Sequence, residues 1–329
     1  MRILSRATLP ALFALLLVTV VPVGSGLADA AAPTSWAANC WANVRSRPST
    51  SAWIRTRIEK STVVTVSWTV QGSNYGTSCG GWVSGRSWLA VSAIDGHSVR
   101  SLYGVAMLYV AAGLFRYVPP PTQYGVDISQ WNGRVNFTKV ADSGRTFVIA
   151  RATVGRLITD TAYARNRAGA LKAGLSFTAY HFALPDPSRY DAIREADHFL
   201  AVAQLEKGML MPALDLETAG GLSPLKLQAW VRAWLERVYD RTGLRAMIYT
   251  NQPFWRASMA NTTWFAQHGY TILWIARWAT KSPTVPAAGW SGRGWTMWQY
   301  SDCGHVPGIP SRCTDLDQLR GVDLAKLTW

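Results

Sequence analysis

Between residues 125 and 317, strand-like and helix-like segments alternate, and this alternation constrains the fold more than any other feature of the chain. Strands are predicted at residues 125–129, 147–152, 177–183, 211–217, 247–250, 272–276, 295–300 and 314–317, and helices at 162–173, 189–205 and 224–242. The last helix has Ser223 as N-cap, Pro224 at its first position and Gly243 just past its end. Eight strands with helices between them predict an α/β fold, a (β/α) barrel. Helical patterns thin out after Ile272, so we expect an irregular barrel whose last strands are joined by loops or hairpins.

A proline run at residues 118–123 predicts a semi-rigid linker in front of this barrel. The preceding part reads as short β-strands: residues 63–70 alternate, Gly72, Gly76 and Gly80-Gly81 mark turns, and further strand segments follow at 82–83 and 88–91. This pattern predicts a small barrel.

Residues 42–50, followed by the alternating strand, resemble the opening of bacterial Src-homology-3-type (SH3-like) domains, which are often cell-wall attachment modules. The resemblance covers residues 37–117. It implies a small N-terminal all-β domain that binds the cell wall.

The N-terminus has the features of a secretory signal. Two arginines precede an apolar run at residues 9–23, and Ala28-Asp29-Ala30 supplies a small-x-small cleavage site, so residues 1–30 are predicted to be a signal peptide. The alternative is a retained membrane anchor, but prolines and a glycine interrupt the run short of the roughly 20 apolar residues that a span needs. We see no other membrane segment, and expect a secreted protein in the medium or on the cell wall.

The chain carries a formal net charge of +14. Removal of Arg2, Arg6 and Asp29 with the signal leaves +13, so the secreted protein stays strongly basic. We expect a polyanionic partner, either a cell wall with its anionic polymers or a membrane surface. Nucleic acid is disfavoured because the Lys and Arg residues are scattered and form no reading motif. The alternative is that the basic charge only aids solubility.

Four cysteines, Cys40, Cys79, Cys303 and Cys313, imply two disulfides outside the cytoplasm. Three connectivities are possible, and the natural one is local, with Cys40 bonded to Cys79 and Cys303 to Cys313. The spacing has no zinc-ligand pattern, so no metal is expected.

Asp215-Leu216-Glu217 closes the apolar run at residues 209–214. Alternate residues of a strand share a face, so the two carboxylates point the same way, roughly 6 to 7 Å apart along the backbone. Each charge raises the pKa of the other group, and such a pair can hold one carboxyl protonated for general acid catalysis at a glycosidic bond. The alternative is a strand end whose acids meet water or a helix N-terminus.

Asp127 on the first strand and Asp315 on the last extend this cluster. Active sites of such barrels lie at the C-terminal ends of the strands, and closure makes the first and last strands neighbours. We therefore expect four acids to converge on one mouth. Four buried acids without basic partners lower the stability of the fold. This cost favours a functional role for the cluster over a chance arrangement.

The segments 125–133, 179–182, 214–217, 298–300 and 315–317, in this order, resemble glycoside hydrolase family 25. That family comprises peptidoglycan muramidases (lysozymes) on an irregular barrel with fewer helices than strands, and the resemblance covers residues 124–329. It implies that Glu217 is the catalytic acid/base, Asp215 its carboxylate partner, and Asp127 and Asp315 the other acids of the pocket, without metal or cofactor. Asp215 would stabilise the oxocarbenium ion or orient the substrate's N-acetyl group, and either route retains the anomeric configuration.

The sequence departs from the family at two points. Val154-Gly155 stands where the family usually has Glu-Gly, and Asp317 replaces the more usual Asn of the closing motif. Neither position is assigned the acid/base role. We therefore expect these departures to affect subsite affinity or pH optimum.

Substrate contacts are predicted for Tyr180, His181, Trp298 and Tyr300 at strand ends, because flat rings can stack on sugar faces. The alternative is a hydrogen-bonded wall histidine and core aromatics. Ser129 and Ser301 have no base and acid at triad-like positions, which disfavours serine hydrolysis.

Together these features predict a secreted muramidase that cleaves the β-1,4 bond between N-acetylmuramic acid and N-acetylglucosamine. Two rivals remain: an inactive wall-binding protein, and a hydrolase of another N-acetylated glycan such as chitin. The sequence does not indicate an oligomeric state.

Overall fold

The computed structural model describes residues 33–319, 321 and 324–329. The predicted signal peptide, residues 1–30, lies outside the described residues. In the described part of the chain, no helix is both long and apolar enough to cross a membrane.

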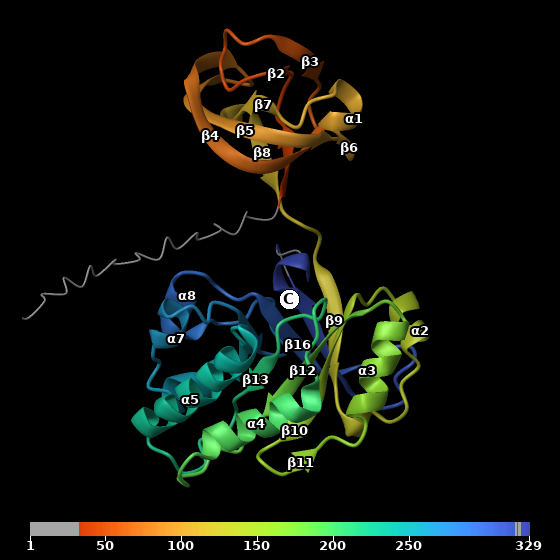
Figure 1. The fold of residues 1–329 in the computed structure, drawn as a ribbon, viewed down its shortest axis with the longest axis vertical. Coiled ribbons are helices and arrows are strands. Elements are labelled where there is room, and N and C mark those ends of the chain that lie inside the picture. Colours follow the sequence, from red (N-terminus) through yellow and green to blue (C-terminus); the bar gives the residue numbers. More distant parts are fainter. Residues whose placement is uncertain (1–32, 320, 322–323) are drawn as a thin grey trace, which may run out of the picture.

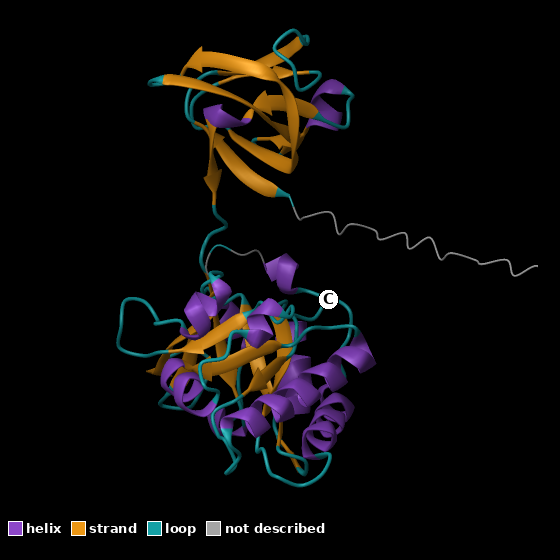
Figure 2. Ribbon diagram, turned by 90° about the vertical axis from the view of Figure 1, so that its left-hand side faces the viewer, coloured by secondary structure: helices purple, strands orange, loops and turns teal. Residues whose placement is uncertain are grey.

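The N-terminal part is a strongly curved sheet of eight strands (Figures 1 and 2). They are β1 (Thr34–Ala38), β2 (Ala42–Arg45), β3 (Ile54–Ile58), β4 (Val63–Ser78), β5 (Trp82–Ile94), β6 (His97–Ser98), β7 (Leu108–Ala111) and β8 (Phe115–Val118), with helix α1 (Val99–Tyr103) and a 3-10 turn at Ala112–Leu114. The strand order is β3-β2-β7-β5-β4-β1-β8, with β6 paired to β5. The pairings of residues 33–118 therefore form an open series, and the predicted small barrel is not confirmed.

Two glycines were assigned the wrong role from sequence. Gly72 and Gly76 lie inside β4, which pairs with β5 as one long hairpin, and only the predicted turn at residues 80–81 is a turn. A Cβ at Gly72 would lie 2.0 Å from the carbonyl oxygen of Pro48, and one at Gly76 would lie 2.7 Å from the ring of Trp82. These glycines permit close approach within the sheet, which local sequence does not reveal.

The second part is an eight-stranded barrel. Its strands are β9 (Gln123–Ile128), β10 (Phe147–Val154), β12 (Ser176–Phe182), β13 (Ala213–Asp215), β14 (Met247–Asn251), β15 (Leu273–Ala276), β16 (Met297–Gly304) and β17 (Thr314–Leu319), and β11 (Ile158–Thr159) is added beside β10. The barrel closes because β9 pairs with β10 in parallel and with β17 in antiparallel orientation. The last strands were expected to be joined by loops or hairpins, and β16 and β17 form an antiparallel hairpin.

Helices cover the outside of the barrel (Figure 1). They are α2 (Phe137–Asp142), α3 (Tyr163–Lys172), α4 (Asp191–Ala203), α5 (Pro224–Thr242), α6 (Gln252–Ser258), α7 (Trp264–Gln267) and α8 (Pro286–Ser291), with 3-10 turns at Gln130–Asn132 and Leu324–Leu327. The predicted strands and the three predicted helices are present. In the described part the barrel has fewer helices than strands, as expected. Ser223 is the N-cap of α5, but its side chain makes no capping hydrogen bond.

The barrel has two hydrophobic layers, because neighbouring strand residues face opposite sides. An outer layer packs the strands against the helices and includes Val126, Ile128 and Leu214. An inner layer fills the barrel and includes Tyr180, Tyr249 and Trp274. Side chains of strand residues between the outer-layer positions therefore point toward the barrel axis, where the acids lie.

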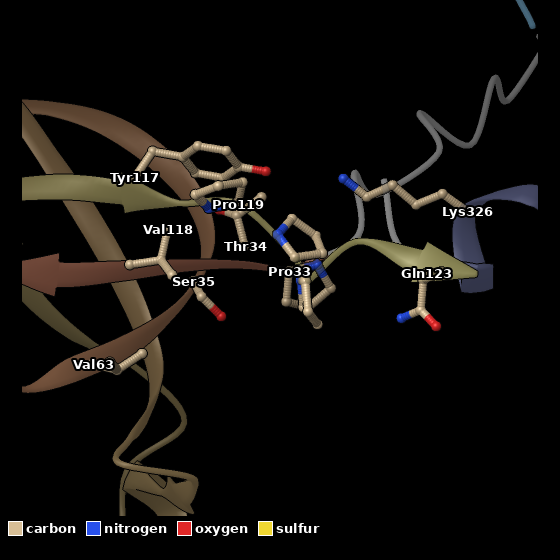
Figure 3. A pocket seen from close by; sticks show the side chains of 11 residues that line it. Pro33, Thr34, Ser35, Val63, Tyr117, Val118, Pro119, Gln123 and Lys326 are labelled. Carbon is tan, nitrogen blue, oxygen red and sulfur yellow. The ribbon is translucent and has the colours of Figure 1, made fainter. Parts of the chain in front are cut away.

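Both predicted disulfides are present, Cys40–Cys79 and Cys303–Cys313. Residues 119–122 connect β8 to β9 without helix or strand. A cavity of about 340 Å³ lies along this segment (Figure 3), lined by Tyr117 and Thr34 from the N-terminal sheet and by Gln123 and Lys326 from the barrel.

Candidate active site

Closure of the barrel brings acids from both ends of the sequence together. Asp127 on β9 stands directly opposite Asp315 on β17 in the strand register. Asp317 follows two residues later and therefore shares their face. Because Val126 and Ile128 belong to the outer layer, this face is the inner one.

The Asp215-Leu216-Glu217 segment enters the same space from β13. The Leu216 amide donates to the Tyr249 carbonyl at 3.0 Å, and the Thr250 hydroxyl donates to the Leu216 carbonyl at 3.0 Å. These bonds extend the strand geometry past its last paired residue, so Asp215 and Glu217 project on one side. Asp215 is buried, whereas Glu217 lies exposed at the rim.

The two carboxyl groups lie within hydrogen-bonding reach of each other. Burial, followed by the charges of Glu217 and Asp127, raises the pKa of Asp215 well above its usual value. Loss of hydration also raises the pKa of Glu217, and the hydrogen bond with Asp215 opposes this. Oδ1 of Asp215 is buried and has no hydrogen-bond partner among the described residues. The pair can therefore hold a proton, and its outer member, Glu217, is exposed.

The β9 and β17 acids form the other half of the cluster. Burial and the neighbouring Asp317 raise the pKa of Asp127, while a 2.8 Å hydrogen bond from the Gln299 amide opposes this shift. Burial raises the pKa of both Asp315 and Asp317 to about 8. Among the described residues, no group of three or more His, Cys, Asp or Glu side chains is arranged to hold a metal ion.

A cation also acts on this cluster. Arg151 on β10 lowers the pKa of Asp215, against the larger effects of burial and of the neighbouring acids. Its Nε donates to Oδ2 of Asp160 at 3.0 Å, and Asp160 is itself buried. This ion pair fixes the guanidinium on the Asp215 side of the cluster.

Gln299 connects the acids to an aromatic wall, and the sequence analysis did not select it. Its Oε1 accepts hydrogen bonds from the Tyr249 hydroxyl and the Trp278 indole, both at 3.0 Å, and its amide nitrogen donates to Asp127. The signal that was available is strand period: Met297 is in the inner layer, so Gln299 two residues later faces inward as well.

A cavity of about 180 Å³ opens beside Glu217. Its lining also includes Asn251, Pro253, Ala276, Arg277 and Trp278. Trp278 is 45% exposed, so part of its side chain is available to a ligand. A carboxyl group, an amide and a flat ring around one cavity suit a sugar.

Comparison with known families matches this barrel: the model of glycosyl hydrolases family 25 covers residues 126–309. The chain belongs to this family. The matched segment begins after β8, so the N-terminal sheet lies outside the match.

Curated proteins and solved structures that are similar to this family 25 chain include lysozymes and a muramidase. It is 31% identical to lysozyme M1 of Streptomyces globisporus over 194 residues, which cover 56% of this chain and 64% of that protein. It is 36% identical to an N,O-diacetylmuramidase of Arthroderma benhamiae, over 54% of this chain and 76% of that protein. The structure of a family 25 lysozyme from Aspergillus fumigatus aligns with a TM-score of 0.57 and 30% identity, covering 63% of this chain and 99% of that one.

The position of His181 in the family 25 barrel does not support its predicted contact with substrate. Its side chain is fully buried (0% exposed) on the outer face of β12, and its ring stacks on Trp234 of α5 at 5.4 Å. Its nitrogens hydrogen-bond Thr153 at 2.8 Å and Glu195 at 2.7 Å. This is the hydrogen-bonded wall histidine of the alternative reading.

The predicted contacts of Trp298 and Tyr300 are likewise unsupported, because both rings face the outer layer. Trp298 is buried and its indole donates to the Arg277 carbonyl at 2.7 Å, while Tyr300 packs edge-on against Tyr124. Of the four predicted contacts only Tyr180 faces inward, where Asp127 and Asp215 add to burial in raising its pKa.

Proposed function

We propose that the chain is a lysozyme, an N-acetylmuramidase that hydrolyses the β-1,4 bond between N-acetylmuramic acid and N-acetylglucosamine in peptidoglycan. One observation carries this proposal: buried Asp215 stands behind exposed Glu217, beside a cavity, in a family 25 barrel. The raised pKa of both groups supports a proton shared between them.

In this proposal Glu217 is the acid/base, because it is the member of the pair that a substrate can reach. It protonates the leaving glycosidic oxygen and later takes a proton from the attacking water. Asp215 either stabilises the oxocarbenium ion or orients the N-acetyl group of the substrate. Both routes predict retention, which NMR of the first-formed anomer tests.

Asp127 and Asp315 shape the floor of the site, and the Gln299 amide bonded to Asp127 fixes that carboxyl in place. Tyr180 and the exposed indole of Trp278 are the proposed contacts with the sugars. No cofactor or metal takes part in this mechanism.

We also propose secretion through a signal peptide at residues 1–30 and attachment to the wall through an SH3-like domain at residues 37–117, joined by the linker at 118–123 to the catalytic barrel at 124–329. The net charge of +13 after signal removal supports retention on a polyanionic wall in a salt-dependent way.

The test compares the unmodified protein with Glu217→Gln on teichoic-acid-free peptidoglycan and on chitin oligomers. The proposal expects soluble products from peptidoglycan alone, and none from the variant, because the amide keeps the shape but cannot donate the proton. Products from chitin alone would transfer the assignment to another N-acetylated glycan. Tight binding without products would support the inactive wall-binding protein.

A further inference from the structure

A groove of about 430 Å³ crosses the N-terminal sheet, far along the chain from the acids of the barrel. The buried rings of Tyr75 and Trp88 pack edge to face and both line it. The indole of Trp41 lines it and is 60% exposed. Because Cys40 is bonded to Cys79, the backbone beside Trp41 is held against the end of β4.

Positive charge in this groove has no partner of opposite sign. Residues 33–118 contain eight Lys and Arg but two Asp and Glu, and in this stretch of the described chain no ion pair is formed. Arg45 on β2 and Arg57 on β3 both line the groove, and no acidic side chain lines it. The groove therefore favours an anion.

Both guanidinium groups are held in place yet keep donors free for a ligand. Arg45 donates to the Ala52 carbonyl at 2.7 Å, and Nε of Arg57 donates to the Asn43 side chain at 3.0 Å. Each guanidinium has five N–H donors, so terminal donors of both remain available. Guanidinium groups held in a fixed orientation bind carboxylates and phosphates well, because two of their N–H groups can donate to one anion.

The remaining lining distinguishes between anionic wall polymers. An exposed indole beside the side chains of Asn43 and Thr50 offers a flat apolar face and amide or hydroxyl partners next to the charge. A poly(glycerol phosphate) chain supplies charge but no flat group for Trp41. A peptide-substituted sugar strand supplies carboxylates, amides and ring faces together.

We propose that this groove is a second binding site, which takes a carboxylate-bearing, peptide-substituted strand of peptidoglycan between Trp41 and the Arg45/Arg57 pair. The choice of strand rests on the proposed function, since it assumes that the chain acts on the wall. The groove holds the wall while the barrel cleaves it, so binding and turnover are separable.

The experiment measures binding of the full chain carrying Glu217→Gln, which prevents digestion, to three polymers: teichoic-acid-free peptidoglycan, the same material after amidase removal of its peptides, and poly(glycerol phosphate). We expect the tightest binding to the first, because general electrostatic attraction to the other polymers does not use the groove as a whole. Arg45→Gln with Arg57→Gln should weaken binding to the first about tenfold or more, and so should Trp41→Ala. Arg86→Gln and Trp68→Ala are the matched controls, since both residues are exposed and neither lines the groove.

Binding that survives the groove substitutions, or that falls equally in the control variants, would overturn the site. Equal binding to poly(glycerol phosphate) or to peptide-free glycan would overturn the ligand. Circular dichroism of each variant checks that the sheet is folded, and Trp41→Ala tests the site without touching the charges. Turnover of soluble peptidoglycan fragments, measured with Glu217 intact, separates the two proposals: its absence would refute the muramidase without bearing on the groove.

Discussion

Replacement of Asp317 by asparagine should stabilise the protein at neutral pH. The Asp317 side chain is fully buried, its Oδ1 accepts from the Trp274 indole at 2.8 Å, and its Oδ2 has no hydrogen-bond partner among the described residues. Burial raises its pKa to about 8. An amide has the shape of the protonated acid and keeps both an acceptor and a donor, but it never has to lose a proton.

The sign of the effect follows from this raised pKa. Well below pH 4 the folded and the unfolded chain both carry the proton, and at pH 4 the unfolded chain has only begun to release it, so up to pH 4 the two proteins should be similar in stability. Between about pH 4 and pH 8 the unfolded chain releases the proton while the folded chain keeps it, so the stability of the unmodified protein falls as pH rises. At about 1.4 kcal/mol per pH unit, some 3 units up to pH 7 give at most about 4 kcal/mol. Because Asp127 beside it can share the proton, we expect about 2–4 kcal/mol.

The assay is urea unfolding of Asp317→Asn and of the unmodified protein at pH 4 and pH 7. Asp240→Asn, at an exposed position of α5, is the matched control and should show no such trend. A stability gain that does not change with pH, or a variant that is less stable at pH 7, would refute the reasoning.

Three further predictions concern the rest of the molecule. Deletion of residues 37–117 should weaken wall binding more than it lowers turnover of soluble fragments; unchanged binding would remove the targeting role. His181→Phe should cost about 3–5 kcal/mol of unfolding free energy, because it leaves buried Glu195 without its ring partner. Activity per folded molecule should persist, and a selective loss of activity would restore a substrate role for the histidine. Replacement of Cys40 and Cys79 by serine should cost about 4 kcal/mol, from the loss of a cross-link spanning 39 residues, and no change in thermal unfolding would contradict this.

The sequence predicted the barrel because its strands are short apolar runs and because three of the helices between them, α3, α4 and α5, are long enough to show a helical period. The barrel helices that it missed, α2, α6, α7 and α8, are too short to show a helical period. The curved N-terminal sheet was harder, because the roles of Gly72 and Gly76 depend on contacts with Pro48 and Trp82 that only the fold creates.

In the candidate site, the acids could be predicted because they end apolar strands whose neighbours follow from barrel closure. Three of the four predicted ring contacts, those of His181, Trp298 and Tyr300, are not supported, for a reason that strand geometry explains. Tyr180 and His181 are adjacent on one strand, so they cannot both face the mouth, and Trp298 and Tyr300 flank inward-facing Gln299. Strict use of the alternation of strand side chains would have excluded His181, Trp298 and Tyr300 as contacts and would have selected Gln299.

The most direct test of the central claim identifies the sugar ends that the protein releases. Teichoic-acid-free peptidoglycan is digested with the unmodified protein and with Glu217→Gln, the products are reduced with borohydride, and the new ends are identified by mass spectrometry. The account predicts reduced N-acetylmuramic acid ends with the unmodified protein and none with the variant. Reduced N-acetylglucosamine ends, or equal release by the variant, would contradict it.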